Sequence, residues 1–363
     1  MEIGTPVPFA VSSRPSKLLV ISLAESGLGH LKDLRVGIVG LGEAGQLHLD
    51  TWSKTPGVQV VALCDVRSEQ ALRAVGTAIP CYIDAEDMFE SAGLDAISLC
   101  TPTASHHPIG EMALARGIGL LCEMPATPNF RLTEELLRAA HPTGTRFQLA
   151  SQFRNLGEVR LAKDLMEEGA IGDVMHFQIE LSRQIDMSSR WQSQPAQSGG
   201  GVLIDQGTPA FDLVRFLFGG IKQIESSRLR PVQKLKVEDQ VMSFLTVGNQ
   251  IRGQIVKSWS MRPASDFFLT VHGSKGTLAL GWKASFVQRN GEDPVHIFNE
   301  CAMDAAYRRM MCEFRDQVRK RSEPWMSEED SLALSAAVDA AYRSLTSGRP
   351  VSVESFDRKT AAA

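Results

Sequence analysis

Three glycines stand at a spacing that suits phosphate binding. Gly40, Gly42 and Gly45 occur in the segment GLGEAG, between a short apolar run (34–40) and a segment with helical spacing. In that arrangement the first glycine permits a tight turn, the second lets a pyrophosphate approach the backbone, and the third lets helix and strand pack closely. The unpaired N–H groups that begin the helix would face the phosphates. The residues predicted to bind a dinucleotide here are Gly40, Leu41, Gly42, Glu43, Ala44 and Gly45.

An acidic residue ends the next apolar run. Asp65 closes the segment VQVVALCD and follows Gly45 by 20 residues. At that position a carboxylate accepts hydrogen bonds from the adenine ribose hydroxyls. Its charge would repel a 2′-phosphate, so Asp65 favours NAD. Arg67 is also a predicted cofactor contact, and because it could offset that repulsion, NADP stays possible.

Two further apolar runs end in residues that could contact the cofactor. One ends in CTPTASHH (100–107) and the other in CEMP (122–125). In a parallel sheet, ligands bind outside the carboxyl ends of the strands, so both segments should lie at the same edge as Gly42. His106 also has a plainer interpretation, as polarity at the start of a helix. The cofactor contacts predicted at this edge are Thr101, Pro102, Thr103, His106, Glu123 and Met124.

Two kinds of architecture must position these residues. Through residue 152, apolar runs alternate with helical segments, a rhythm typical of a parallel sheet covered on both faces. After residue 153, strand-like segments follow one another with short turns, which indicates an antiparallel sheet. The predicted fold class is α/β, with an N-terminal Rossmann dinucleotide-binding domain and a C-terminal α+β domain built on an open, mostly antiparallel sheet. The predicted boundaries are 1–33 for an N-terminal extension, 34–152 for the Rossmann domain, and 153–355 for the substrate and oligomerisation domain.

Helical periodicity also marks the second half of the chain. One helix is predicted over 202–218, after a glycine triplet. Two more, at 303–321 and 327–346, end the chain and could pack back on the Rossmann domain. Ser327 is a plausible N-cap for the last helix, because Asp330 follows at the spacing of a capping box.

Composition excludes some partners and compartments. The net charge of −4 does not attract nucleic acid or acidic membranes, so no partner of either kind is expected. The apolar stretch KLLVISLA near the N-terminus is too short to span a bilayer. The six cysteines form no CxxC pair and mostly lie inside apolar runs, which is typical of buried thiols in a reducing compartment, and the predicted location is the cytoplasm. No ligand spacing suggests a metal, and none is expected.

The ordered set of motifs resembles the Gfo/Idh/MocA family (glucose–fructose oxidoreductase, inositol dehydrogenase, rhizopine catabolism). The resemblance rests on GLGEAG, TPTASH, CEMP where the family writes E-K-P, EEGAIGDV, and SGGGVLIDQGTPAFDLVRFLFG where it writes G-G-G-x-L-x-D-x-G-x-H-x-x-D. It implies NAD(P)-dependent oxidation or reduction of a sugar, cyclitol or related small polar substrate. It also implies that the substrate lies between the nicotinamide and the open sheet, and that a homodimer or homotetramer forms through that sheet.

The family's usual acid/base residues are missing from this chain. The lysine of E-K-P is replaced by Met124, and the histidine of D-x-G-x-H by Pro209, which cannot titrate. Asp205 is the remaining candidate acid or base, although it could simply cap a helix start. Glu123 is a second candidate, as a ligand of the nicotinamide ribose or as a second catalytic carboxylate. An imine-like substrate would need less proton transfer and would suit the missing pair.

The resemblance also indicates which residues of the second domain contact the substrate. Arg183 or Arg190 could clamp a carboxylate or phosphate, or could be ordinary surface arginines. The predicted substrate contacts are Met124, Gln152, Arg154, Arg183, Trp191, Asp205, Thr208 and Pro209.

Two other functions suit the same motifs. One is a redox-neutral enzyme that holds NAD tightly and catalyses epimerisation, elimination or glycoside cleavage through transient oxidation. The other is a non-catalytic sensor of the dinucleotide. Fold alone does not choose among them.

Overall fold

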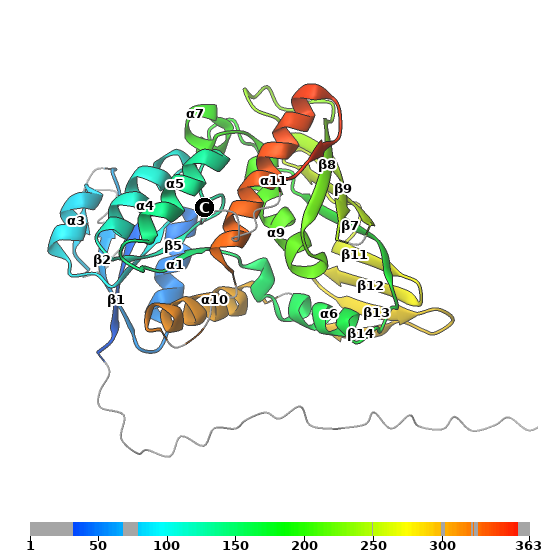
Figure 1. The fold of residues 1–363 in the computed structure, drawn as a ribbon, viewed down its shortest axis with the longest axis horizontal. Helices are drawn as coiled ribbons and strands as arrows, with labels where there is room; N and C mark the ends of the chain where they lie inside the picture. The colour runs from blue at the N-terminus through cyan, green and yellow to red at the C-terminus, as the bar shows by residue number, and fades with distance from the viewer. Residues whose placement is uncertain are drawn as a thin grey trace, which may run out of the picture. The chain divides into compact units, whose positions relative to one another are not determined.

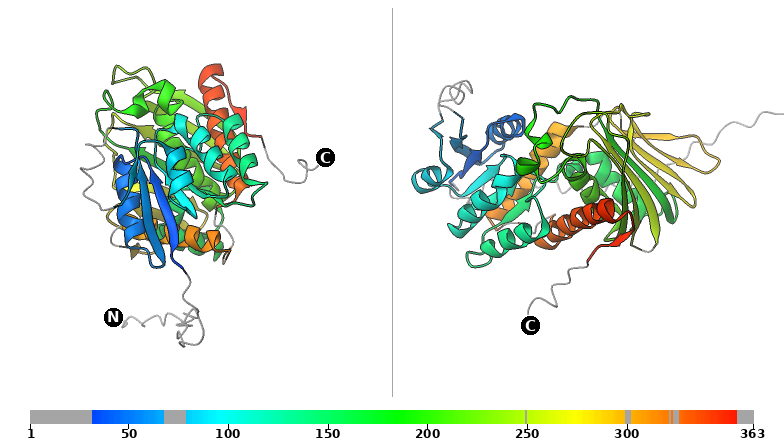
Figure 2. Two further views of the ribbon diagram at one scale, coloured as in Figure 1. Left: turned by 90° about the vertical axis from the view of Figure 1, so that its left-hand side faces the viewer. Right: turned by 90° about the horizontal axis from the view of Figure 1, so that it is seen from above.

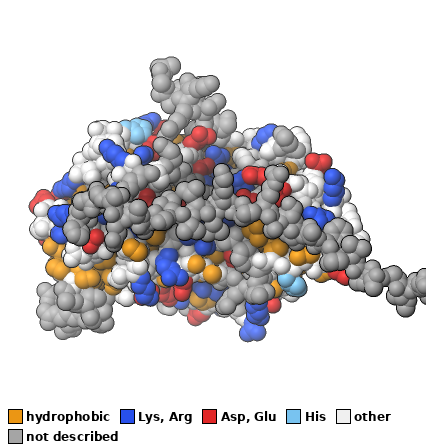
Figure 3. Space-filling view, turned by 90° about the horizontal axis from the view of Figure 1, so that it is seen from below, with side chains coloured by type: hydrophobic (Ala, Val, Ile, Leu, Met, Phe, Trp, Pro, Cys, Tyr) orange, Lys and Arg blue, Asp and Glu red, His pale blue; other side chains and the backbone are white. Residues whose placement is uncertain are grey.

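The structure, a computed structural model, describes residues 32–67, 79–248, 250–298, 302–320, 322 and 326–354. The predicted N-terminal extension, residues 1–33, lies outside the described residues except for its last two positions. Positive and negative side chains are interspersed over the face shown in Figure 3, as the near-zero net charge leads one to expect.

In the described residues, the first sheet has six parallel strands in the order β3-β2-β1-β4-β5-β6 (Figure 1). The strands β4 and β5 are buried at every position, because both faces of the sheet are covered. The order reverses between β1 and β4, so a crevice opens at the carboxyl ends of these two strands. The bounds are β1 (Leu34–Val39), β2 (Val58–Cys64), β3 (Cys81–Tyr82), β4 (Ala96–Leu99), β5 (Gly119–Cys122) and β6 (Phe147–Leu149).

Helices cover both faces of this sheet, each with its own apolar core. On one face, α4 and α5 pack in a core with Leu99 and Leu120. On the other, Trp52 of α1 meets Phe314 of α10 with ring centroids 6.5 Å apart, so the penultimate helix of the chain packs on the first sheet. The bounds are α1 (Glu43–Ser53), α3 (Ala85–Ser91), η1 (Thr103–Ser105), α4 (His106–Ala115), α5 (Phe130–Ala140) and α10 (Met303–Val318).

The second sheet has nine described strands in the order β14-β13-β12-β11-β7-β10-β9-β8-β15, and every pair is antiparallel except β7 with β10. With the parallel first sheet it confirms the predicted fold class. The sequence does not predict strands at β3, β13, β14 or β15, because short or partly exposed strands carry a weak periodic signal. The bounds are β7 (Val174–Ser182), β8 (Ile221–Arg228), β9 (Gln240–Val247), β10 (Ile251–Ser258), β11 (Phe267–Gly273), β12 (Gly276–Gly281), β13 (Ser285–Arg289), β14 (Val295–Phe298) and β15 (Val351–Ser352).

Helices pack on one face of the second sheet (Figure 2). On the other face Phe244 of β9 is more than half exposed. The long helix α11 contacts both α5 of the first layer and α9 and β8 of the second. Its predicted N-cap is present: Ser327 and Asp330 exchange the two hydrogen bonds of a capping box. The bounds are η2 (Phe153–Asn155), α6 (Gly157–Glu167), η3 (Trp191–Ser193), α7 (Pro195–Ser198), α8 (Val202–Asp205), α9 (Gly207–Phe218) and α11 (Glu328–Ser347).

The helix predicted over 202–218 is broken in two. It forms α8 and α9, which separate at Gln206. Pro209 is the reason, because it lacks the N–H that a continuous helix would bond to the carbonyl of Asp205. In the first turn of α9 that N–H is not needed. The break leaves Asp205 at a helix end instead of in a helix interior.

Candidate active site

The GLGEAG turn (residues 40–45), called the phosphate turn below, has the geometry that its glycines predict. Gly40 has a φ of +90°, and a Cβ there would lie 2.7 Å from the backbone of Cys100. A Cβ on Gly45 would overlap the carbonyl oxygen of Gly40. Gly42 differs, since a Cβ there would meet no atom within 4 Å, and it gives α1 no side-chain cap. The start of α1 is therefore open to an anion, which fits a dinucleotide pyrophosphate.

Asp65 lies beside this turn with its carboxylate oriented by two partners. Its Oδ2 accepts a hydrogen bond from the Leu41 N–H at 2.8 Å. The Arg67 guanidinium donates to both oxygens, at 2.7 and 2.6 Å. Burial acts to raise the pKa of Asp65, but the hydrogen bonds from Arg67 and Leu41 outweigh it and lower the pKa, so the carboxylate is charged.

The segment that follows β4, predicted to contact the cofactor, is only partly exposed. Thr101 and Pro102 are partly exposed where β4 ends, whereas Thr103 and His106 are buried. The ring nitrogens of His106 lie 2.9 Å from the Pro125 carbonyl oxygen and 2.8 Å from that of Thr101. The prediction that Thr103 and His106 contact the cofactor is corrected accordingly. His106 instead ties η1 to the loop after β5, and its burial lowers its pKa.

Glu123 and Met124 directly follow β5, and Glu123 has a partner that the sequence does not reveal. Its Oε1 lies 2.9 Å from Nε2 of His48, a fully buried residue of α1. Its Oε2 accepts a longer bond, 3.3 Å, from the Met124 N–H. Tyr307 of α10 packs edge-on against the His48 ring, with centroids 5.8 Å apart. His48 follows Gly45 by three residues, on the helix face turned to the sheet, and this spacing was the available signal.

A pocket of about 480 Å³ lies in the second domain and holds Asp205. The indole N–H of Trp259 donates to its Oδ2 at 3.2 Å. Burial raises the pKa of Asp205 to about 6, and the Trp259 hydrogen bond and the charges of Arg183 and Arg190 limit the rise. The carboxyl is thus poised to exchange a proton near neutral pH.

Four of the predicted substrate residues line this pocket: Gln152, Arg183, Asp205 and Pro209. Six lining residues were missed: Phe153, Glu180, Leu181, Ser182, Gln206 and Trp282. Three of the lining polar atoms have no hydrogen-bond partner in the described part of the chain, namely Gln152 Oε1, Ser182 Oγ and Gln206 Oε1. These atoms are themselves buried, and a buried polar atom of this kind calls for a partner such as a water molecule or a ligand hydroxyl. Trp282, which stands in no motif, rests on Phe268 with ring centroids 4.7 Å apart and is 37% exposed.

The prediction that Arg154 contacts the substrate is corrected by its position. Its side chain is 4% exposed. Its Nε donates to Asp212 at 2.7 Å and its Nη1 to Asp330 at 3.0 Å. The guanidinium therefore ties η2 to α9 and α11, and contact with a substrate is excluded by its burial. The sequence around Arg154 does not show whether its side chain is buried or faces a pocket. Its burial depends on two carboxylates, which lie 58 and 176 residues away in the chain.

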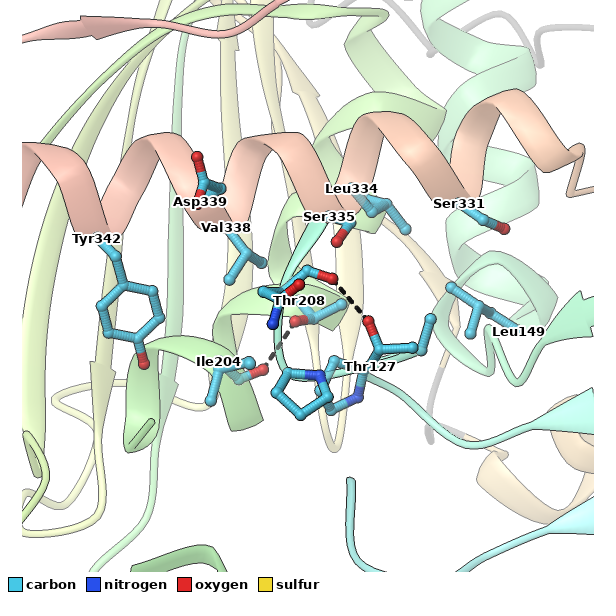
Figure 4. A pocket seen from close by; sticks show the side chains of 14 residues that line it. Thr127, Leu149, Ile204, Thr208, Ser331, Leu334, Ser335, Val338, Asp339 and Tyr342 are labelled. Atoms are coloured by element: carbon cyan, nitrogen blue, oxygen red, sulfur yellow. Dashed lines mark hydrogen bonds between the residues drawn. The ribbon is translucent and has the colours of Figure 1, made fainter. Parts of the chain in front are cut away.

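Thr208, Trp191 and Met124 are also outside the pocket lining. Thr208 lines a separate cavity of about 40 Å³ between α11 and the loop after β5, and its hydroxyl donates to the Ile204 carbonyl at 2.7 Å (Figure 4). Its predicted contact with substrate is corrected, because the first turn of α9 directs it to the opposite side from Pro209. Trp191 begins η3, and Met124 packs on the main core.

No group of three or more His, Cys, Asp or Glu side chains in the described ranges could hold a metal ion. The helices of the same residues include none long and apolar enough to cross a membrane.

The fold and the open phosphate turn define a nicotinamide-dinucleotide enzyme. Residues 34–151 match the oxidoreductase family with an NAD-binding Rossmann fold, and residues 159–279 match the Gfo/Idh/MocA C-terminal domain. The chain belongs to the Gfo/Idh/MocA family, which confirms the resemblance. It is an NAD(P)-dependent oxidoreductase, and the predicted NAD cofactor is confirmed.

Named relatives align along most of the chain. D-apiose dehydrogenase of Paraburkholderia graminis is 25% identical, over 92% of this chain and 93% of its own length. Inositol 2-dehydrogenase of Rhizobium meliloti is 25% identical, over 88% and 99%. Levoglucosan dehydrogenase in complex with NADH has the same fold, with a TM-score of 0.81 and 18% identity over 89% of this chain and 100% of that one. An Agrobacterium radiobacter oxidoreductase, in complex with NAD⁺, L-tartaric acid and magnesium, has a TM-score of 0.79 and 22% identity over 88% and 98%.

Proposed function

We propose that the protein oxidises a secondary hydroxyl of a small cyclic sugar or cyclitol, or reduces the corresponding ketone, in the pocket that holds Asp205. One observation carries the proposal: Asp205 shares that pocket with three unpaired polar atoms, on Gln152, Ser182 and Gln206. A ligand with several hydroxyls would satisfy those atoms, whereas an apolar ligand would leave them unpaired. The D-apiose and inositol dehydrogenases among the relatives support a polyhydroxylated substrate.

Asp205 takes the acid/base role for which the family's lysine and histidine are missing. Gly42 and Asp65 would hold the dinucleotide, which when bound would supply or accept the hydride. In the oxidation direction, the Asp205 carboxylate accepts the hydroxyl proton as the C–H bond electrons leave as hydride, so that one carbonyl forms and one proton is released. Trp259 fixes the orientation of the carboxylate through its indole N–H. The charges of Arg183 and Arg190 favour its ionised form, as Lys would at position 124.

Trp282 supplies the apolar part of the site. Its ring is 37% exposed and lines the same pocket as Asp205, and it packs against the rings of Phe153 and Phe268. Ligand pockets commonly combine such an aromatic surface with a few polar groups that fix orientation. We infer that the less polar face of a sugar ring packs on Trp282 and that its hydroxyls point to the Gln side chains.

The test is a screen of the purified protein with NAD⁺ against pentoses, hexoses, their lactone and anhydro forms, and inositols, monitored by the absorbance of the reduced cofactor. We expect turnover with at least one cyclic polyol and none with acyclic monoalcohols. Turnover confined to simple alcohols would contradict the proposed substrate class. Cofactor that cannot be dialysed away and that no substrate reduces would favour the redox-neutral alternative.

We expect the cofactor preference to depend on Asp65. Replacing Asp65 with alanine should shift the ratio of NADPH to NADH affinity by roughly tenfold toward NADPH, because the Arg67 guanidinium, now unpaired, can bind a 2′-phosphate. The measurement is a fluorescence titration with each reduced cofactor. The matched control is Arg67→Ala, which should weaken NADPH binding more than NADH binding. An unchanged ratio in the Asp65 variant would show that this pair does not select the cofactor.

The open face of the second sheet is the surface that we assign to a homodimer or homotetramer. The exposure of Phe244 on that face supports the assignment. The cytoplasmic location stays a prediction.

A further inference from the structure

One ion pair joins the second domain to the phosphate turn. The guanidinium of Arg190 meets the carboxylate of Glu43 in two parallel contacts, Nη1 to Oε2 and Nη2 to Oε1, both 3.2 Å. Glu43 is the first residue of α1 and follows Gly42 directly. Arg190 belongs to the substrate loop, which we define as residues 183–201, between β7 and α8. The sequence predicts Glu43 as a cofactor contact and leaves Arg190 open between a clamp for a carboxylate or phosphate and a surface arginine, and it does not connect the two residues.

Glu43 is an unexpected residue beside a pyrophosphate site. Its side chain is 82% exposed, and the space over neighbouring Gly42 is open. A carboxylate there repels the two negative charges of a pyrophosphate unless a cation offsets it. Within the described residues, Arg190 is the cation that pairs with it. A planar guanidinium binds phosphate oxygens as readily as a carboxylate.

The substrate loop lies along the cofactor edge of the first sheet. Its short helix α7 contacts η1, which follows β4. Gly199, with a φ of +81°, packs so closely on Pro128 that a Cβ would lie 2.7 Å from the proline Cβ. The charge of Arg190 also acts on Asp205. Arg190 thus pairs with the first residue of α1, and its charge also acts on the pocket carboxyl.

We propose that Arg190 is a pyrophosphate ligand that Glu43 holds in place until the cofactor binds. When the diphosphate binds, the guanidinium exchanges Glu43 for the phosphate oxygens, because two phosphate charges attract it more strongly than one exposed carboxylate. The new ion pair then holds the substrate loop against the bound cofactor. The proposal depends on dinucleotide binding at the GLGEAG turn and not on the identity of the substrate. It makes Glu43 a competitor of the cofactor and Arg190 its clamp.

The experiment uses ligands that differ in the pyrophosphate, so no substrate is needed. The full chain is titrated calorimetrically with ADP and with adenosine, in the wild type and in the variants Arg190→Ala, Arg190→Lys, Glu43→Gln and Glu43→Gln/Arg190→Ala. The matched control is Arg262→Ala, which removes an exposed arginine that donates to Gln184 of the same loop at 2.9 Å. Melting temperatures verify that each variant is folded.

We expect Arg190→Ala to weaken ADP binding by roughly tenfold or more and to leave adenosine binding unchanged. Arg190→Lys should retain part of the affinity, and Glu43→Gln should tighten ADP binding severalfold. The double variant should bind ADP better than Arg190→Ala alone, because the unpaired carboxylate is gone. ADP affinity in Arg190→Ala within about twofold of Arg262→Ala would overturn the proposal. Equal weakening by Glu43→Gln and Arg190→Ala would also overturn it, because it would make the pair a structural tether. Neither outcome depends on turnover, so the proposed function is tested separately.

Discussion

Replacing Asp205 with asparagine should lower turnover about 10²- to 10⁴-fold, the usual contribution of a positioned acid or base. Asparagine has the same shape and can accept the Trp259 hydrogen bond at its oxygen, but it cannot take the hydroxyl proton. The measurement is kcat on whichever cyclic polyol the screen identifies, with NADH affinity measured in parallel. NADH affinity should change little, because Asp205 lies in the second-domain pocket and not at the phosphate turn.

The pH profile provides an independent readout of the same group. Since the pKa of Asp205 is about 6, oxidation by the wild type should increase as pH rises through 6, where the carboxyl loses its proton. Ketone reduction, which needs the protonated form, should decrease over the same interval. The step should be absent in Asp205→Asn and present in Glu180→Gln, which removes another carboxylate of the pocket. If Asp205→Asn kept wild-type turnover, another group would carry the proton. The same conclusion would follow if its residual activity still changed with pH near 6.

Replacing Lys257 with methionine should raise the free energy of unfolding at pH 7 by about 3 kcal/mol, the second large effect that we expect. The Lys257 side chain is fully buried in β10. Its ammonium has the Ser243 hydroxyl at 3.2 Å and the Phe211 ring at 4.8 Å. Burial lowers its pKa to about 7, although the charge of Glu238 favours the protonated form. Methionine fills similar volume without a charge to desolvate.

The sign of the pH dependence follows from the direction of that shift. Between pH 7 and the ordinary lysine value of 10.5, the unfolded chain binds a proton at this site that the folded chain does not. Wild-type stability should therefore rise with pH across this window, and the rise should be smaller in Lys257→Met. Urea denaturation at several pH values measures it. Lys54→Met, at the exposed lysine that follows α1 as its C-cap, is the control and should keep the wild-type slope. Equal slopes in Lys257→Met and wild type would mean that Lys257 is not a buried cation.

The sequence by itself determined the features that depend on residues close together in the chain, namely the phosphate turn, Asp65 and the Ser327 capping box. The strand β1, the GLGEAG turn and α1 are consecutive, and two of the glycines, Gly40 and Gly45, are required by backbone contacts with Cys100 after β4 and with Gly40 itself. Asp65 follows at a distance set by one helix and one strand. The Ser327 capping box spans four residues. Periodicity and capping act over such distances, so fold class, cofactor and family could be predicted.

Tertiary structure alone decided what each polar residue does, because a side chain's environment comes from distant segments. Asp205 has a raised pKa because the pocket buries it, and Trp259, 54 residues later, limits the rise through its hydrogen bond. Arg154 is removed from the site by Asp212 and Asp330, and Glu123 is paired with His48 from another helix. Trp282 reaches the pocket only through the order of strands in the sheet. Burial and partner distance have no local signature in the sequence, and they separate the residues that can do chemistry from those that hold the fold.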